Sequence, residues 1–263
     1  MINRFQVKPF LTAVSALALI SAASQVVADG ASRLDNYNVV TEERLSNPEP
    51  ENWLSWRGNY EGWGHSPLTQ INADNVGDLV PVWSYSTGVT EGHQAPPIVN
   101  DGVMYVATPG NQILAMDAAT GTELWRYVRE LPDDLFQLHP TNRGVALYGD
   151  KVYMATLDAG VVALDAKTGN VVWDVSTGDY TDGYYSTLSL LAADGKIVTG
   201  VSGGEFGIRG YVMALDAETG AEAWKTYTIP APGEPGSETW KGDSWKTGGG
   251  PVWMQPNFDD EIG

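Results

Sequence analysis

The chain has 263 residues and a formal net charge of −18, which results from 33 acidic and 15 basic side chains. This excess of negative charge disfavours binding to nucleic acid and to anionic membranes; it either attracts a basic protein partner or serves solubility in a salty habitat. The sequence has no cysteine, which excludes disulfides and a lipoprotein anchor, and 43% of its residues are hydrophobic, as expected for a packed globular protein.

The first 28 residues have the pattern of a secretory signal peptide. Arg4 and Lys8 precede an almost continuous apolar run over residues 10–23, and small or β-branched residues stand before the expected cleavage after Ala28. The run is short for a bilayer span, although an uncleaved anchor is the alternative. We therefore expect a soluble, periplasmic mature chain of residues 29–263, with a net charge of −20 once two positive charges are removed.

A sequence phrase that recurs three times is the main indication of the fold. It reads AMDAATGTELWRY at 115–127, ALDAKTGNVVWDV at 163–175 and ALDAETGAEAWKT at 214–226. Its aspartates, Asp117, Asp165 and Asp216, follow one another at intervals of 48 and 51 residues. A period of this length is typical of one supersecondary unit per repeat, either stacked or arranged radially.

Each repeat is predicted to contain four short strands. The segment Asp-Ala-Xaa-Thr-Gly favours a tight turn between two strands, with Asp as a cap and Gly at positive φ. Upstream of each phrase, a second strand pair is expected around the turns at 100–102, 149–150 and 194–195. Four strands per repeat predict an all-β β-propeller, with no amphipathic helix after residue 28.

The tryptophan near the end of each phrase is predicted to be structural. Trp125, Trp173 and Trp224 occupy the same place in the three repeats. Blades pack face to face around an axis, and a large ring can lock one blade to the next. Trp83 is expected to play the same part for the blade that closes the ring.

The stretches between the repeats carry a more specific resemblance. They are TNRGVALYGD at 141–150, GVSGGEFGIRGYVMALD at 200–216 and WKTGGGPVWMQ at 245–255. With the segment that starts at residue 52, they resemble the N-terminal part of the pyrroloquinoline quinone (PQQ) dependent alcohol dehydrogenases, the methanol and ethanol dehydrogenase family. The resemblance runs over nearly the whole mature chain and implies a ring of eight blades, of which about half is present.

The resemblance implies a metal ligand and a cofactor-binding turn near residue 205. Glu205 matches the glutamate that binds the metal polarising the quinone, either Ca²⁺ or a lanthanide, since hard cations prefer carboxylate oxygen. Ser202, Gly203 and Gly204 match the strand end whose backbone approaches the cofactor. The alternative is that Glu205 is simply a solvent-exposed acid in a loop.

The same resemblance assigns the remaining cofactor contacts. Trp253 matches the ring that lies flat under the quinone, unless it is one more blade-packing tryptophan. Arg143 matches an arginine that contacts quinone oxygens, the alternative being a surface charge. Thr187 and Gln94 match two further contact positions, although methanol dehydrogenase has Glu where this chain has Gln94. Many relatives carry two adjacent cysteines above the cofactor; this chain has Gln and Leu at 137–138.

The function expected from the resemblance is oxidation of a primary alcohol, with electrons passed to a periplasmic cytochrome c. The family's catalytic base would lie beyond residue 263, so the chain is expected to be truncated and inactive alone, or to be completed by a second chain. A non-catalytic propeller scaffold and a degenerate remnant are the alternatives. Neither a zinc site nor a dinucleotide-binding site is expected: the three histidines, at 65, 93 and 139, lack ligand spacing, and the glycines of 200–210 do not join a strand to a helix.

Overall fold

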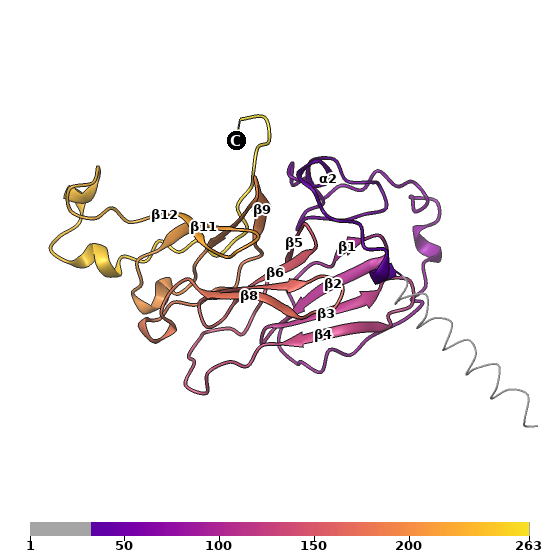
Figure 1. Cartoon of the computed structure of the whole chain (residues 1–263), viewed down its shortest axis with the longest axis horizontal. Coiled ribbons are helices and arrows are strands. Elements are labelled where there is room, and N and C mark those ends of the chain that lie inside the picture. The colour runs from indigo at the N-terminus through magenta and orange to yellow at the C-terminus, as the bar shows by residue number, and fades with distance from the viewer. Residues whose placement is uncertain (1–32, 263) are drawn as a thin grey trace, which may run out of the picture.

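The computed structural model describes residues 33–262 and contains three four-stranded antiparallel sheets, one after another along the chain (Figure 1). The first sheet has the strands β1 (Ile98–Asn100), β2 (Val103–Thr108), β3 (Gln112–Asp117) and β4 (Glu123–Val128). The second has β5 (Ala146–Tyr148), β6 (Lys151–Thr156), β7 (Gly160–Asp165) and β8 (Val171–Ser176). The third has β9 (Leu191–Ala193), β10 (Lys196–Gly200), β11 (Tyr211–Asp216) and β12 (Glu222–Tyr227). The prediction of four short strands per repeat is confirmed.

The recurring turn has the geometry that its residues favour. In the first sheet, the Asp117 carboxylate accepts hydrogen bonds from the backbone N–H groups of Ala119 and Thr120 at 3.0 and 2.9 Å. Gly121 follows with a φ of 71°. Asp165 and Asp216 accept equivalent hydrogen bonds in the other two turns. A side chain that caps its own turn in this way needs no tertiary partner. The turn can therefore be predicted from the sequence.

The tryptophans of the first and second sheets dock each of these sheets onto the turn of the next repeat. Trp125 Nε1 donates to the carbonyl of Ala166 at 3.0 Å, and Trp173 Nε1 donates to the carbonyl of Ala217 at the same distance. The glycine of the receiving turn lets the ring approach, because a Cβ at Gly169 would lie 2.6 Å from the Trp125 ring. Both rings are 9% exposed, so their predicted structural role is confirmed.

Two tryptophans at the ends of this series behave differently from each other. Trp83 lies in an extended segment outside the named strands, yet it docks on the first sheet by donating to the carbonyl of Ala118 at 3.1 Å. Trp224 on β12 has no following turn among the described residues and is 41% exposed. The docking of Trp83 confirms that it plays the same part as its counterparts.

Among residues 33–262, helical structure is limited to short segments. The helix α2 (Glu42–Ser46) was not predicted; its N-cap Thr41 accepts a hydrogen bond from Arg44 N, and it buries Leu45. It has only five residues, too few for an amphipathic pattern to be visible in the sequence. The 3₁₀ segments are η1 (Val76–Asp78), η2 (Tyr180–Asp182), η3 (Gly204–Phe206), η4 (Ser237–Thr239) and η5 (Ser244–Thr247).

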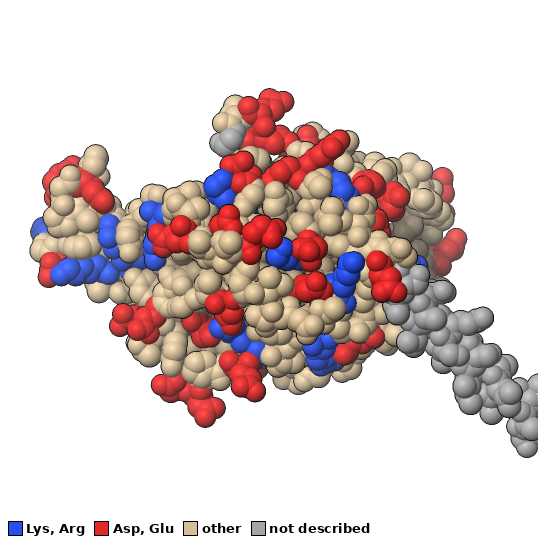
Figure 2. Space-filling model, in the orientation of Figure 1, with Lys and Arg blue, Asp and Glu red and all other residues tan. Residues whose placement is uncertain are grey.

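Within residues 33–262, no helix is long and apolar enough to cross a membrane. The predicted signal peptide, residues 1–28, lies outside the described residues. Acidic side chains are spread over most of the face shown in Figure 2, as the net charge of −18 requires.

Candidate cofactor site

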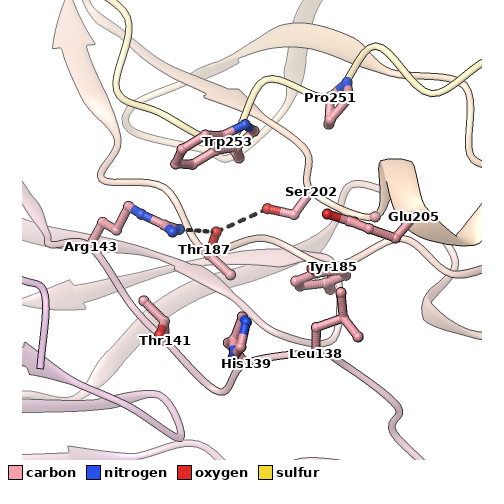
Figure 3. A pocket seen from close by; sticks show the side chains of 11 residues that line it. Leu138, His139, Thr141, Arg143, Tyr185, Thr187, Ser202, Glu205, Pro251 and Trp253 are labelled. Atoms are coloured by element: carbon pink, nitrogen blue, oxygen red, sulfur yellow. Dashed lines mark hydrogen bonds between the residues drawn. The ribbon is translucent and has the colours of Figure 1, made fainter. Parts of the chain in front are cut away.

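A cavity of about 230 Å³ is formed where four segments, distant in the sequence, come together (Figure 3). These are the loop before β5, the loop before β9, the turn after β10 and the segment near residue 252. The lining residues are Leu138, His139, Thr141, Arg143, Tyr185, Thr187, Ser202, Gly203, Glu205, Pro251 and Trp253. Five of them, Arg143, Thr187, Ser202, Glu205 and Trp253, are side chains that the sequence resemblance had assigned to the cofactor or the metal.

A row of polar side chains crosses the middle of the cavity (Figure 3). Arg143 Nη1 donates a hydrogen bond to Thr187 Oγ1, which is 2.9 Å from Ser202 Oγ. Thr187 and Ser202 are buried, so their hydroxyl groups have defined positions. The row therefore presents one cation and two hydroxyl groups to a ligand in the cavity.

Arg143 is held at the cavity by Trp253, and none of the described acidic residues neutralises its charge. Its guanidinium carbon lies 4.7 Å from the centre of the Trp253 ring, a cation–π distance. Burial lowers the pKa of Arg143 from its usual value. Arginine nonetheless stays charged in proteins, and no acidic side chain in residues 33–262 forms an ion pair with it. An anionic ligand would supply the missing negative charge.

Two glycines allow the chain to turn at the cavity edge. Gly203 has a φ of 103°, and a Cβ on it would lie 2.2 Å from the carbonyl oxygen of Gly183. Gly204 does not line the cavity itself, but a Cβ there would lie 2.9 Å from Pro251 Cδ. The turn therefore packs closely against two other segments of the protein, and it presents Glu205 next in sequence; the predicted approach of its backbone to a cofactor stays a prediction.

Glu205 is exposed and forms no hydrogen bond or ion pair with another described residue. Together with burial, which is the larger cause, its charge raises the pKa of the nearby Tyr185 phenol. An uncommitted carboxylate suits a hard cation. It is a single ligand, however, since residues 33–262 contain no group of three His, Cys, Asp or Glu side chains able to hold a metal. The cofactor or other residues would have to complete the coordination.

The residues that line the cavity differ in part from the residues predicted for the site. Gln94 is exposed in the segment before β1 and does not line the cavity. Leu138, His139, Thr141, Tyr185 and Pro251 line it without having been predicted. Their closeness in sequence to Arg143, Thr187 and Trp253 was the available signal, but sequence distance does not show which neighbours face the cavity.

The arrangement fits a flat, negatively charged aromatic ligand. The Trp253 ring supplies an apolar face, and Arg143 with the two hydroxyl groups supplies donors for carboxylate or carbonyl oxygens. A ligand of this chemistry matches PQQ, a planar quinone that carries carboxylates.

Comparison with known proteins assigns the family. Residues 53–263 match the family described as PQQ: Glucose/ethanol/alcohol dehydrogenase, beta-propeller domain. The chain belongs to this PQQ-dependent dehydrogenase family. It is 37% identical over 243 residues to quinoprotein alcohol dehydrogenase PedH from Pseudomonas putida, and 42% identical over 226 residues to a quinoprotein ethanol dehydrogenase from Pseudomonas aeruginosa. These matches cover 85% and 74% of this chain.

Solved structures agree with this assignment. The quinohemoprotein alcohol dehydrogenase ADHIIG from Pseudomonas putida superposes with a TM-score of 0.78 at 40% identity, covering 85% of this chain and 35% of that one. A europium-containing methanol dehydrogenase superposes with a TM-score of 0.76 at 34% identity, covering 83% and 42%. The three sheets are therefore blades of a PQQ β-propeller, as predicted.

The chain spans only part of its relatives. It covers 41% of the length of PedH and 36% of the ethanol dehydrogenase from Pseudomonas aeruginosa. Family and fold are thus assigned for the portion of the relatives that this chain matches.

Proposed function

We propose that this chain provides the cofactor-binding part of a periplasmic, PQQ- and metal-dependent enzyme that oxidises a primary alcohol. The observation that carries the proposal is the convergence of Glu205, Arg143 and Trp253 on one cavity. PQQ with its metal would need three separate features. These are a carboxylate for the metal, a cation for the negative charge of the ligand and an indole face for its ring. Electrons would leave to a basic cytochrome c, to which the negative surface is suited.

Each side chain has a distinct part in this proposal. Arg143 would bind and orient a carboxylate or carbonyl oxygen, and Trp253 would exclude water from one face of the ring. Thr187 and Ser202 would add hydrogen bonds to the ligand edge. Glu205 would contribute one oxygen ligand to the metal.

The bound quinone would supply the chemistry that protein side chains lack, accepting the two electrons removed from the alcohol. The general base that takes the hydroxyl proton is proposed to lie in the part of the family ring that aligns beyond residue 263. The cavity residues described here therefore hold and orient the cofactor, and substrate oxidation is a property of the complete ring.

A cofactor titration and an activity assay together test this function. The full mature chain is titrated calorimetrically with PQQ in the presence of Ca²⁺ or La³⁺, the latter because one solved relative is a europium-containing methanol dehydrogenase. Dye-linked alcohol oxidation is then measured on this chain extended by the region of PedH that it does not cover. We expect metal-dependent binding in the first assay and turnover in the second.

Glu205→Ala should abolish turnover and weaken metal-dependent binding, because it removes the cavity's only described carboxylate. Glu238→Ala is the matched control, an exposed acid in η4 away from the cavity. Full turnover with Glu205→Ala would remove the metal role. Absence of PQQ binding in every protein would favour the rival, a non-catalytic propeller scaffold.

A further inference from the structure

The segment between β12 and Trp253 extends away from the third sheet and then returns to it. Figure 1 shows this segment, residues 229–250, reaching beyond β11 and β12 at the left of the view. None of residues 231–248 is buried. A segment with so little buried surface has a low local stability unless specific contacts hold it.

The returning end of the segment is paired with the residues before β11. Gly249 N donates a hydrogen bond to the carbonyl of Ile208 at 2.9 Å, and Gly210 N donates to the carbonyl of Gly249 at 2.7 Å. A Cβ on Gly210 would lie 2.0 Å from the carbonyl oxygen of Gly250, so a glycine is required at this approach. Trp253, which lines the cavity, follows shortly after this pairing.

The side chain of Arg209 contacts both ends of the segment. Its Nε and Nη2 both donate to the carbonyl of Ile229, at 2.9 and 2.7 Å. Its guanidinium carbon lies 3.8 Å from the centre of the Tyr227 ring and 4.8 Å from the centre of the Trp245 ring. A planar guanidinium can donate hydrogen bonds from its edge while its faces contact aromatic rings. One side chain therefore connects the start of the segment, at Ile229, with Trp245 near its end.

The ion pair of Arg209 is the weaker part of this set of contacts. Arg209 Nη2 is 3.5 Å from Glu234 Oε2, and the Glu234 side chain is 57% exposed, whereas that of Arg209 is 13% exposed. Water screens an ion pair that has an exposed partner. The carbonyl of Ile229 and the two rings therefore provide most of the attachment.

We infer that Arg209 is a positioning residue of the cofactor site, which fixes the path of residues 229–250 and thereby the place of the Trp253 ring in the cavity. Arg209 does not line the cavity, so it acts through the segment. The consequence for PQQ rests on the proposed function, whereas the consequence for Trp253 does not. A ring that is already in place does not have to be ordered when a ligand binds, and this favours affinity.

Fluorine NMR of the full mature chain, labelled with 5-fluorotryptophan, measures the surroundings of Trp253 without a ligand. Trp253→Phe identifies its signal among those of the ten tryptophans. In Arg209→Met, which removes the guanidinium group and keeps an unbranched side chain, the Trp253 signal should shift and broaden. The signals of Trp125 and Trp173 should stay unchanged, because these rings dock on other segments.

Lys225→Met is the matched control. Lys225 also contacts an aromatic ring, with Nζ 3.7 Å from the centre of the Tyr211 ring, and it donates to the carbonyl of Thr177 rather than to residues 229–250. This variant should keep the Trp253 signal. Calorimetric titration with PQQ in the presence of Ca²⁺ should then show an affinity about tenfold weaker in Arg209→Met and unchanged in Lys225→Met.

The results separate this inference from the function on which it rests. An unchanged Trp253 signal in Arg209→Met would show that Arg209 does not position the ring. Equal changes in the signals of Trp125, Trp173 and Trp253 would show that Arg209 stabilises the fold in general, which also contradicts the inference. A displaced Trp253 signal with undiminished PQQ affinity would overturn the link to the cofactor. If none of the proteins binds PQQ and the signal is still displaced, the proposed function fails, while the positioning of Trp253 by Arg209 is supported.

Discussion

At the scale of single residues, the turn after β10 shows how a missing side chain can shape a site. Gly203 lies so close to the carbonyl oxygen of Gly183 that a Cβ would lie 2.2 Å from it. Its φ of 103° is also a conformation that other residues rarely adopt. The neighbouring Ser202 and Glu205 both line the cavity, so a displacement of Gly203 would move both side chains.

Gly203→Ala should therefore lower the free energy of unfolding by about 3 kcal/mol and weaken PQQ binding. Gly195→Ala is the control, since Gly195 has a φ of 69° but no atom within 4 Å of its Cβ position. The control should lose only the conformational part, about 1 kcal/mol, and should keep its affinity for PQQ. Urea unfolding and calorimetry measure the two effects; equal losses in both variants would show that close approach is unimportant.

At the scale of elements, one contact is repeated from sheet to sheet. The indole of each docking tryptophan donates to the second residue of the next Asp-Ala-Xaa-Thr-Gly turn, and its ring covers the glycine of that turn. The contact joins neighbouring repeats, so it stabilises the order of the sheets as well as each turn. Trp224 has no such turn to cover among residues 33–262.

Trp173→Ala and Trp224→Ala should consequently differ in stability although the residues hold equivalent sequence positions. The former empties a site in which the ring is 9% exposed, and we expect a loss of about 3–5 kcal/mol. The latter removes a ring that is 41% exposed, and we expect a loss of about 1 kcal/mol. Urea unfolding of the full chain compares them. Similar losses would mean that Trp224 is covered in solution, by a second copy or by another partner.

At the scale of the whole molecule, repulsion among the excess negative charges destabilises the compact folded state. Acidic side chains outnumber basic ones by 33 to 15, and they are scattered over the visible face of the molecule (Figure 2). The partly buried ion pairs, such as Arg129 with Asp158 at 2.7 Å, offset this repulsion locally. They are screened less by salt than the exposed charges are.

Salt should therefore stabilise the folded chain. Raising NaCl from about 0.01 M to 0.1 M shortens the Debye length from about 30 Å to 10 Å and should raise the melting temperature by about 2–4 °C. Differential scanning calorimetry measures the shift, with glucose at matched osmolarity as the control. A melting temperature that falls with salt would instead show that ion pairs dominate the electrostatics of the fold.

The sequence by itself determined the repeated parts of this protein. The turn at Asp117 could be predicted because the aspartate caps the backbone only two and three residues ahead, and the position of Trp125 could be predicted because its partner recurs with the same period. The short helix α2 escaped prediction, since five residues carry no periodic signal. The resemblance to PQQ dehydrogenases predicted that Arg143, Glu205 and Trp253 belong to one site. Local sequence patterns alone could not have grouped them.

Only the tertiary structure decided which residues share the cavity. Residues 138–143 and 251–253 are more than a hundred positions apart in the sequence, and their meeting depends on how successive sheets are placed around one another. That His139 lines the cavity and Gln137 does not was also visible only in the structure, where Phe136 and Pro140 of the same loop contact distant segments. A turn is determined by residues that are adjacent in the sequence. The set of residues that line a cavity is instead determined by packing between segments that are distant in the sequence.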